Sequence, residues 1–146
     1  MPAAELKFRL IYVGDSCIDY HVPAMPVSIS AKDLSIQYNT KVVIDRVQSQ
    51  VDVIVTMAYY CAKKTVFSGG LTTKFEVLNL SSYINAKEGT NEFGISNNFL
   101  PMLVSIGFST ARGYFAAENK GTFLEAFPFP AISVENILKR ISYQLI

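Results

Sequence analysis

Apolar and polar side chains alternate in four stretches of the first half of the chain, and this alternation predicts β-strands. The stretches cover 6–22, 33–45, 51–61 and 65–80. In the clearest of them, 33–45, the apolar face carries Leu34, Ile36, Tyr38, Thr40, Val42 and Ile44. The links between these strands are short and no strand is followed directly by a helix, so we expect one antiparallel sheet of four strands.

The second half of the chain changes to helical spacing. A polar stretch at 81–97 reads as a loop, and a helix is predicted from Asn98, a suitable cap, to Asn119, with Pro101 tolerated in its first turn. Its expected apolar stripe consists of Leu103, Ile106, Thr110, Tyr114 and Ala117. Small residues recur on the opposite side, at Ser105, Ser109, Gly113 and Ala116. A face of small side chains allows close packing, so we interpret this as an interface helix that ends at Gly121.

The last segment, 133–146, predicts a second amphipathic helix capped by Ser133. Its apolar stripe would be Ile137, Leu138, Ile141 and Leu145. The expected fold is therefore a single α+β domain over 1–146. It has a four-stranded antiparallel sheet, with a long helix and a short C-terminal helix on one face.

Composition adds a reason to look for an interface. Half of the 146 residues are apolar and only 17% are charged. Such a chain is expected to bury apolar surface between subunits or to leave some of it open for a partner. The net charge of +1 does not suggest nucleic acid. We expect no membrane-spanning segment and no signal peptide, and the two cysteines form no disulfide framework, which favours the cytoplasm.

Catalytic chemistry is not indicated. The single histidine, His21, has no motif that supplies a nucleophile or an orienting partner, and the cysteines and histidine lack metal-ligand spacing. Asp15 and Asp19 are four residues apart, which would place both on one face of the first predicted strand. Such a pair more commonly forms an exposed acidic patch than a site for acid–base catalysis. We therefore expect no enzyme and no cofactor.

The C-terminal half resembles the SecB export chaperones. The matching residues are Ala111-Arg112 on the long helix, the turn Gly121-Thr122-Phe123, the loop FPFPAI at 127–132 and the start of the last helix at 134–138. Upstream, LIYVGDSCIDYHVP at 10–23 is similar to the first strand of that family, which ends in acidic residues and a proline. The likeness covers nearly the whole chain.

The resemblance implies a cytoplasmic homotetramer, a dimer of dimers, that binds unfolded precursor polypeptides without ATP and presents them to the SecA motor. The residues expected to contact clients are Met102, Tyr114, Phe123, Phe127 and Phe129. Asp15 and Asp19 are expected to dock the motor. The expected oligomer interface consists of Ser105, Ser109, Arg112, Gly113 and Ala116.

Several alternatives stay open at this point. The segment VFSGGLTTKF at 66–75 carries glycines, threonine and lysine where motor-docking members often carry an acid, so a SecB-like chaperone for another client, such as an antitoxin, is the nearest alternative. A thioesterase of the hotdog type and a purely structural oligomerisation module are the other classes. Phe123, Phe127 and Phe129 could line a client groove or cover the sheet as core, and for the proline-flanked pair, Phe127 and Phe129, the two interpretations are equally compatible with the sequence.

Overall fold

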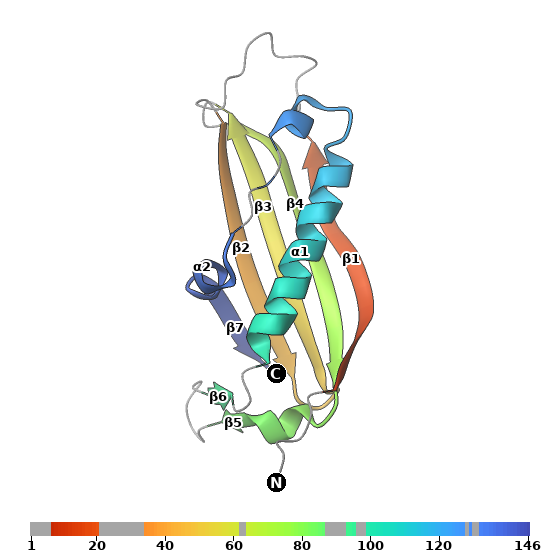
Figure 1. The fold of residues 1–146 in the computed structure, drawn as a ribbon, viewed down its shortest axis with the longest axis vertical. Coiled ribbons are helices and arrows are strands. Elements are labelled where there is room, and N and C mark those ends of the chain that lie inside the picture. The colour runs from red at the N-terminus through yellow and green to blue at the C-terminus, as the bar shows by residue number, and fades with distance from the viewer. Residues whose placement is uncertain are drawn as a thin grey trace.

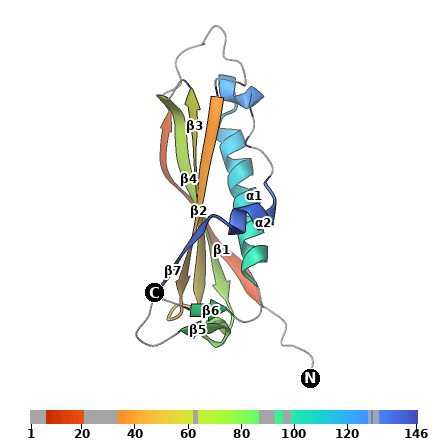
Figure 2. The ribbon, with the colours of Figure 1, turned by 90° about the vertical axis from the view of Figure 1, so that its left-hand side faces the viewer.

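The computed structural model describes residues 7–20, 34–61, 64–86, 93–95, 99–127, 129 and 132–146, with the backbone alone described at 16–20, 86 and 123. The molecule is an α+β fold in two layers. A long, twisted sheet forms one layer, and the helices lie on one of its faces (Figure 1). Seen from the side, none of the helices in the described part of the chain lies over the other face of the sheet (Figure 2).

The sheet has five strands, in the order β1-β4-β3-β2-β7. They are β1 (Phe8–Tyr20), β2 (Leu34–Asp45), β3 (Gln50–Cys61), β4 (Lys64–Val77) and β7 (Ile141–Leu145). The first four pair antiparallel, as the alternation predicted. The fifth strand, β7, runs parallel to β2, so the sheet is mixed and the prediction of four strands was one short.

The predicted helix over 133–146 is wrong beyond its first turn. Ser133 does cap a helix, since its hydroxyl accepts a hydrogen bond from the backbone N–H of Asn136 at 3.3 Å. That helix, α2, covers only Val134–Leu138. Residues four apart lie on the same side of a strand as well as of a helix, so the spacing of Ile141 and Leu145 did not distinguish the two. Pairing with β2 provides hydrogen-bond partners for the backbone of Ile141–Leu145. A short isolated helix is only marginally stable, so a helical conformation of this segment would have been less favourable.

The long helix α1 spans Leu100–Glu118, with Pro101 in its first turn as expected. Its predicted cap, Asn98, lies outside the described residues, and the residue before the helix is Phe99. The buried stripe is Leu100, Leu103, Val104, Gly107, Phe108, Ala111 and Phe115. The helix is therefore rotated from the predicted stripe, because its two phenylalanines take the inward positions and leave Ala117 exposed.

The segment expected to be a loop at 81–97 holds short elements at the lower end of the sheet (Figure 1). They are the 3-10 helix η2 (Leu80–Tyr83) and a small hairpin of β5 (Ile84–Ala86) and β6 (Phe93–Ile95). Another 3-10 helix, η3 (Phe123–Ala126), follows α1. Gly121 lies in the turn between them with a φ of 85°, a left-handed conformation that favours glycine.

The core lies between α1 and the strands beneath it. Alternate side chains of β2 and β3 are buried on the helix side, as the pattern predicted. The closest approach is at Gly107, where an added Cβ would lie 2.7 Å from Cγ1 of Val53. Because Gly107 has no side chain, α1 can pack closely against β3 at this point.

Candidate functional site

Strand β1 is an edge of the sheet, and a run of apolar side chains on it is exposed. Leu10 is 49% exposed, Ile11 37%, Tyr12 55% and Val13 43%. We call these four residues the apolar edge. Among the described strands, β1 hydrogen-bonds to β4 alone, and it forms the right-hand margin of the sheet in Figure 1. Exposed apolar edge strands are rare in monomeric proteins because they invite pairing with another chain.

An irregularity in the pairing of β1 with β4 produces this exposure. Leu10 lies opposite Phe75 and Tyr12 opposite Lys74, so Ile11 is an extra residue in β1. Such a bulge shifts the alternation by one position, which leaves apolar side chains on both faces of the strand. The helix α1 packs over β3 and β4 and does not cover this stretch.

Sequence reasoning missed the apolar edge. The alternation over 6–22 predicts a strand with one apolar and one polar face, whereas the apolar side chain of Leu10 is half exposed. The available signal was the run of four consecutive apolar residues, Leu10 to Val13, inside an otherwise alternating strand. A strand with one solvent-exposed face normally alternates apolar and polar residues. A continuous apolar run is therefore expected only where another element or chain covers both faces of the strand or its edge.

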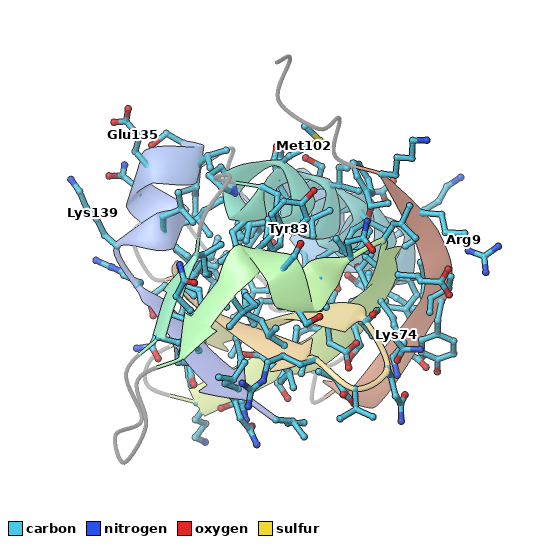
Figure 3. All side chains as sticks on the ribbon, turned by 90° about the horizontal axis from the view of Figure 1, so that it is seen from below. Arg9, Lys74, Tyr83, Met102, Glu135 and Lys139 are labelled. Carbon is cyan, nitrogen blue, oxygen red and sulfur yellow. The ribbon has the colours of Figure 1, made fainter. Side chains whose placement is uncertain are left out.

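Charged pairs flank the apolar edge on the uncovered face of the sheet. The Arg9 guanidinium bonds to the Glu76 carboxylate, with Nε and Oε1 3.2 Å apart, and Nζ of Lys74 lies 3.8 Å from Oδ2 of Asp52. Burial raises the pKa of the Asp52 carboxyl, and the charge of Lys74 opposes this shift. Figure 3 shows Lys74 on the side of the sheet away from α1 and Arg9 projecting outward from β1. The Arg9–Glu76 pair is exposed, and exposed ion pairs contribute little to stability.

Above the apolar edge, a hydrogen bond joins β1 to α1. The Tyr114 hydroxyl donates to Oδ2 of Asp15 at 2.6 Å. This bond holds the pKa of Tyr114 above its ordinary value, and the nearby carboxylate of Glu118 acts in the same direction. The structure thus brings together one residue predicted to contact clients and one predicted to dock a partner.

The prediction that Asp15 and Asp19 share a face is wrong. Asp15 pairs with Leu71, on the helix side, whereas Asp19 pairs with Ser68, at a position of the opposite parity. The reason is a second irregularity of β1, between Ser16 and Asp19. The two acids therefore do not share one face of the strand backbone.

The aromatic residues after α1 differ in their burial. Phe129 is 5% exposed and packs on the rings of Tyr38 and Phe108, so it belongs to the core and offers no surface to a client. Phe127 is half-buried, and its carbonyl accepts a hydrogen bond from the Tyr59 hydroxyl at 2.8 Å. The side chain of Phe123 lies outside the described residues.

The outer face of α1 carries the remaining predicted residues. Met102 is 52% exposed and lies on the side of the helix away from the sheet (Figure 3). Ser109, Gly113 and Ala116 are exposed and Ser105 is half-buried, so most of these small residues face outward. Arg112 is half-buried, and its Nε donates to the Phe129 carbonyl at 3.4 Å, which ties α1 to the following loop.

The buried Tyr59 hydroxyl predicts a specific pH dependence. Burial raises the pKa of Tyr59 to about 12. The un-ionised hydroxyl is thus favoured in the folded protein, so its contribution to stability is complete below a pH of about 10 and is lost as the pH rises further. We expect a plot of the free energy of unfolding against pH to fall less steeply above pH 10 in Tyr59→Phe, measured by urea denaturation. An unchanged slope in this variant would contradict the assignment.

The described residues offer little else for chemistry. They contain no group of three or more histidine, cysteine, aspartate or glutamate side chains that could hold a metal ion. Cys61 is a free, half-buried thiol. Within the same residues, no helix is both long and apolar enough to span a bilayer.

Comparison with known proteins adds no relative. No protein-family model matches the chain. No curated protein and no solved structure matches it either.

Proposed function

We propose that this protein is an ATP-independent chaperone that holds unfolded polypeptides, and that an extended client segment pairs with the apolar edge of β1. The observation that carries the proposal is the exposure of four consecutive apolar side chains on an edge strand, Leu10 to Val13. The SecB-like residue pattern supports the same activity. It makes precursor polypeptides awaiting export the first clients to test.

Edge pairing suits a binder of many sequences. A strand at the edge of a sheet presents backbone N–H and C=O groups on its free side, and these pair with the backbone of any extended chain. The side chains of Leu10 and Val13 lie toward the helix side and that of Tyr12 toward the other side. A client strand paired with β1 could therefore make apolar contacts on both of its faces, so its apolar side chains could lie on either face.

The test of this function is suppression of aggregation. The purified protein, at an equal molar amount, is expected to slow the light scattering of a chemically denatured client when it is diluted from denaturant, with no nucleotide added. A precursor with its export signal and an unrelated denatured enzyme serve as two clients. If the protein slows the aggregation of neither client, the proposal is wrong, and a structural oligomerisation module becomes the better hypothesis. Preference for a single dedicated partner would favour the antitoxin-type alternative.

Self-association is expected through the outer face of α1, which is where we place the tetramer contact. Ser109 and Ala116 are exposed there, and Gly113 has no atom within 4 Å of the position that a Cβ would occupy. Arginine at Ser109 should prevent close helix packing by bulk and charge, so Ser109→Arg is expected to lower the mass measured by light scattering. The matched control is Ser82→Arg, at an exposed serine of η2. An equal effect of both variants, or none of the first, would argue against this interface.

Cytoplasmic location and docking of the SecA motor through Asp15 remain part of the proposal. Asp15 keeps a partner of its own, the hydroxyl of Tyr114. A motor that uses this carboxylate must therefore share it with the tyrosine or displace it. Binding of purified SecA to the intact protein, and its loss in Asp15→Asn, would support this partner.

A further inference from the structure

The face of the sheet away from α1 is hollowed near its upper end. The hollow has a volume of about 380 Å³ and is lined by parts of β2, β3 and β4. Its outward-facing positions include Thr56 and Tyr60 on β3, whose odd-numbered neighbours are buried on the helix side. A volume of this size falls within the range of small-molecule sites in proteins.

Small side chains in the middle strands create the hollow. The cross-strand pairs form two neighbouring rows, one from Gln37 through Ala58 to Ser68 and one from Asn39 through Thr56 to Gly70. Each row thus has an amide side chain at the β2 end and a small or hydroxyl-bearing residue at the β4 end. Residues two apart on one strand are separated by about 6.7 Å, so the amides of Gln37 and Asn39 stand side by side along one wall.

The chemistry of the lining is neutral. None of the ten described residues around the hollow carries a charge, and the polar groups among them are amides and hydroxyls. The charged pairs of this face, Lys74 with Asp52 and Arg9 with Glu76, lie further down the strands and do not line it. Lys41, the next residue of β2 on this face after Asn39, is exposed beyond the hollow. Within the hollow, a charged ligand would lose hydration without gaining a counter-charge from the ten lining residues. A fully apolar one would leave the amides of Gln37 and Asn39 without partners.

A polypeptide strand does not fit this place. The hollow is lined from β2, β3 and β4, and most of its lining belongs to β3 and β4, which are inner strands already paired on both sides. Their backbone groups are therefore not available for strand addition, unlike those of the edge strand β1. The ligand must instead bring hydroxyl or amide groups of its own, together with an apolar face that can contact the ring of Tyr60.

From these features we propose that the hollow is a binding site for a neutral saccharide. The sugar hydroxyls would bond to the amides of Gln37 and Asn39 and the hydroxyls of Thr56 and Ser68, with its C–H face on Tyr60. This site is independent of the apolar edge and of the proposed chaperone activity. Binding of a saccharide is accordingly expected to leave aggregation suppression unchanged.

The test is an NMR titration of the intact protein with maltotriose and with N,N′-diacetylchitobiose. We expect at least one of them to shift the backbone amide signals of the lining residues, with a dissociation constant of about 1 mM or lower. Glucuronic acid and glucosamine, one anionic and one cationic, are expected to bind at least about tenfold more weakly. No shift with either neutral saccharide at about ten times that concentration would overturn the proposal, and so would equal binding of the charged sugars.

Two arginine variants locate the site. Thr56→Arg places bulk and charge in the hollow and is expected to weaken saccharide binding at least about tenfold. Thr72→Arg is the matched control, since Thr72 faces the same side from the inner strand β4 but does not line the hollow. Thermal unfolding of both variants checks that each is folded, and Tyr60→Leu provides a second lining variant that introduces no charge. Equal loss in Thr56→Arg and Thr72→Arg, or unchanged binding in both lining variants, would show that the saccharide binds elsewhere and overturn the assignment.

Discussion

Val13→Lys is expected to lose most of the suppression of client aggregation while keeping the fold. Val13 is 43% exposed on the edge strand, so its replacement removes apolar contact that a client strand would otherwise bury. Burying a valine side chain is worth roughly 1.5–3 kcal/mol, and a half-exposed one roughly half of that. A lysine adds the cost of desolvating an ammonium, and natural edge strands use lysine to block pairing. We therefore expect client affinity to fall about tenfold or more, measured by the ratio of protein to client that halves aggregation.

Val47→Lys is the matched control for this experiment. Val47 lies in the turn between β2 and β3 and is 90% exposed, so the same chemical change is made at an apolar side chain away from the edge. It should leave aggregation suppression unchanged. Tyr12→Lys, at another position of the apolar edge, guards against a local folding defect in Val13→Lys. If the edge variants lower the oligomer mass and Ser109→Arg does not, β1 binds a second copy of the chain instead of a client.

Gly107→Ala is expected to lower the free energy of unfolding by about 1–3 kcal/mol, the usual cost of overpacking a core. The added methyl group would lie 2.7 Å from Cγ1 and 2.9 Å from Cβ of Val53. These atoms belong to a fully buried side chain on a central strand, so the helix and the sheet must move apart. Urea denaturation of the variant, compared with the unmodified protein, gives the difference directly.

Gly113→Ala on the same helix should have the opposite sign. No atom lies within 4 Å of the position where its Cβ would stand, and alanine is a better helix former than glycine. We expect a gain of roughly 0.5–1 kcal/mol when the protein is dilute enough to be dissociated. Unchanged stability in Gly107→Ala would mean that α1 does not pack closely on Val53, and a loss of stability in Gly113→Ala would mean that the space beside Gly113 is not open.

The four long strands were predictable because their alternation is set by burial on one face. β2 and β3 keep this alternation from end to end, and their predicted and observed inward residues agree. β1 escaped the same reasoning, since the register irregularities that expose Leu10 and separate Asp15 from Asp19 arise from pairing with β4. The alternation within a single strand does not indicate where its pairing with the neighbouring strand contains an extra residue.

Position in the sheet explains the other differences. The segment from Ile141 to Leu145 fits a helical and an extended pattern equally well, and the free side of β2 decides between them. The rotation of α1 follows from the packing of Phe108 and Phe115. Phe108 packs on the rings of Tyr38 of β2 and Phe129, and Phe115 packs on the ring of Phe67 of β4. The groove-or-core question for Phe129 likewise depended on Tyr38, a residue far away in the sequence.

The parallel pairing of β2 with β7 has a consequence for the order of folding. Thr40 pairs with Ile141, about a hundred residues later in the chain, so this part of the sheet cannot form until nearly the whole described chain has been synthesised. Contacts between residues so far apart in sequence form slowly, because a long loop must close first. Until then β2 is itself a free edge, with Val42 and Ile44 on a strand that has one neighbour instead of two. We expect the nascent chain to expose a second pairing surface during synthesis, at the margin opposite to β1, and to lose its part from Thr40 to Ile44 when β7 pairs with it.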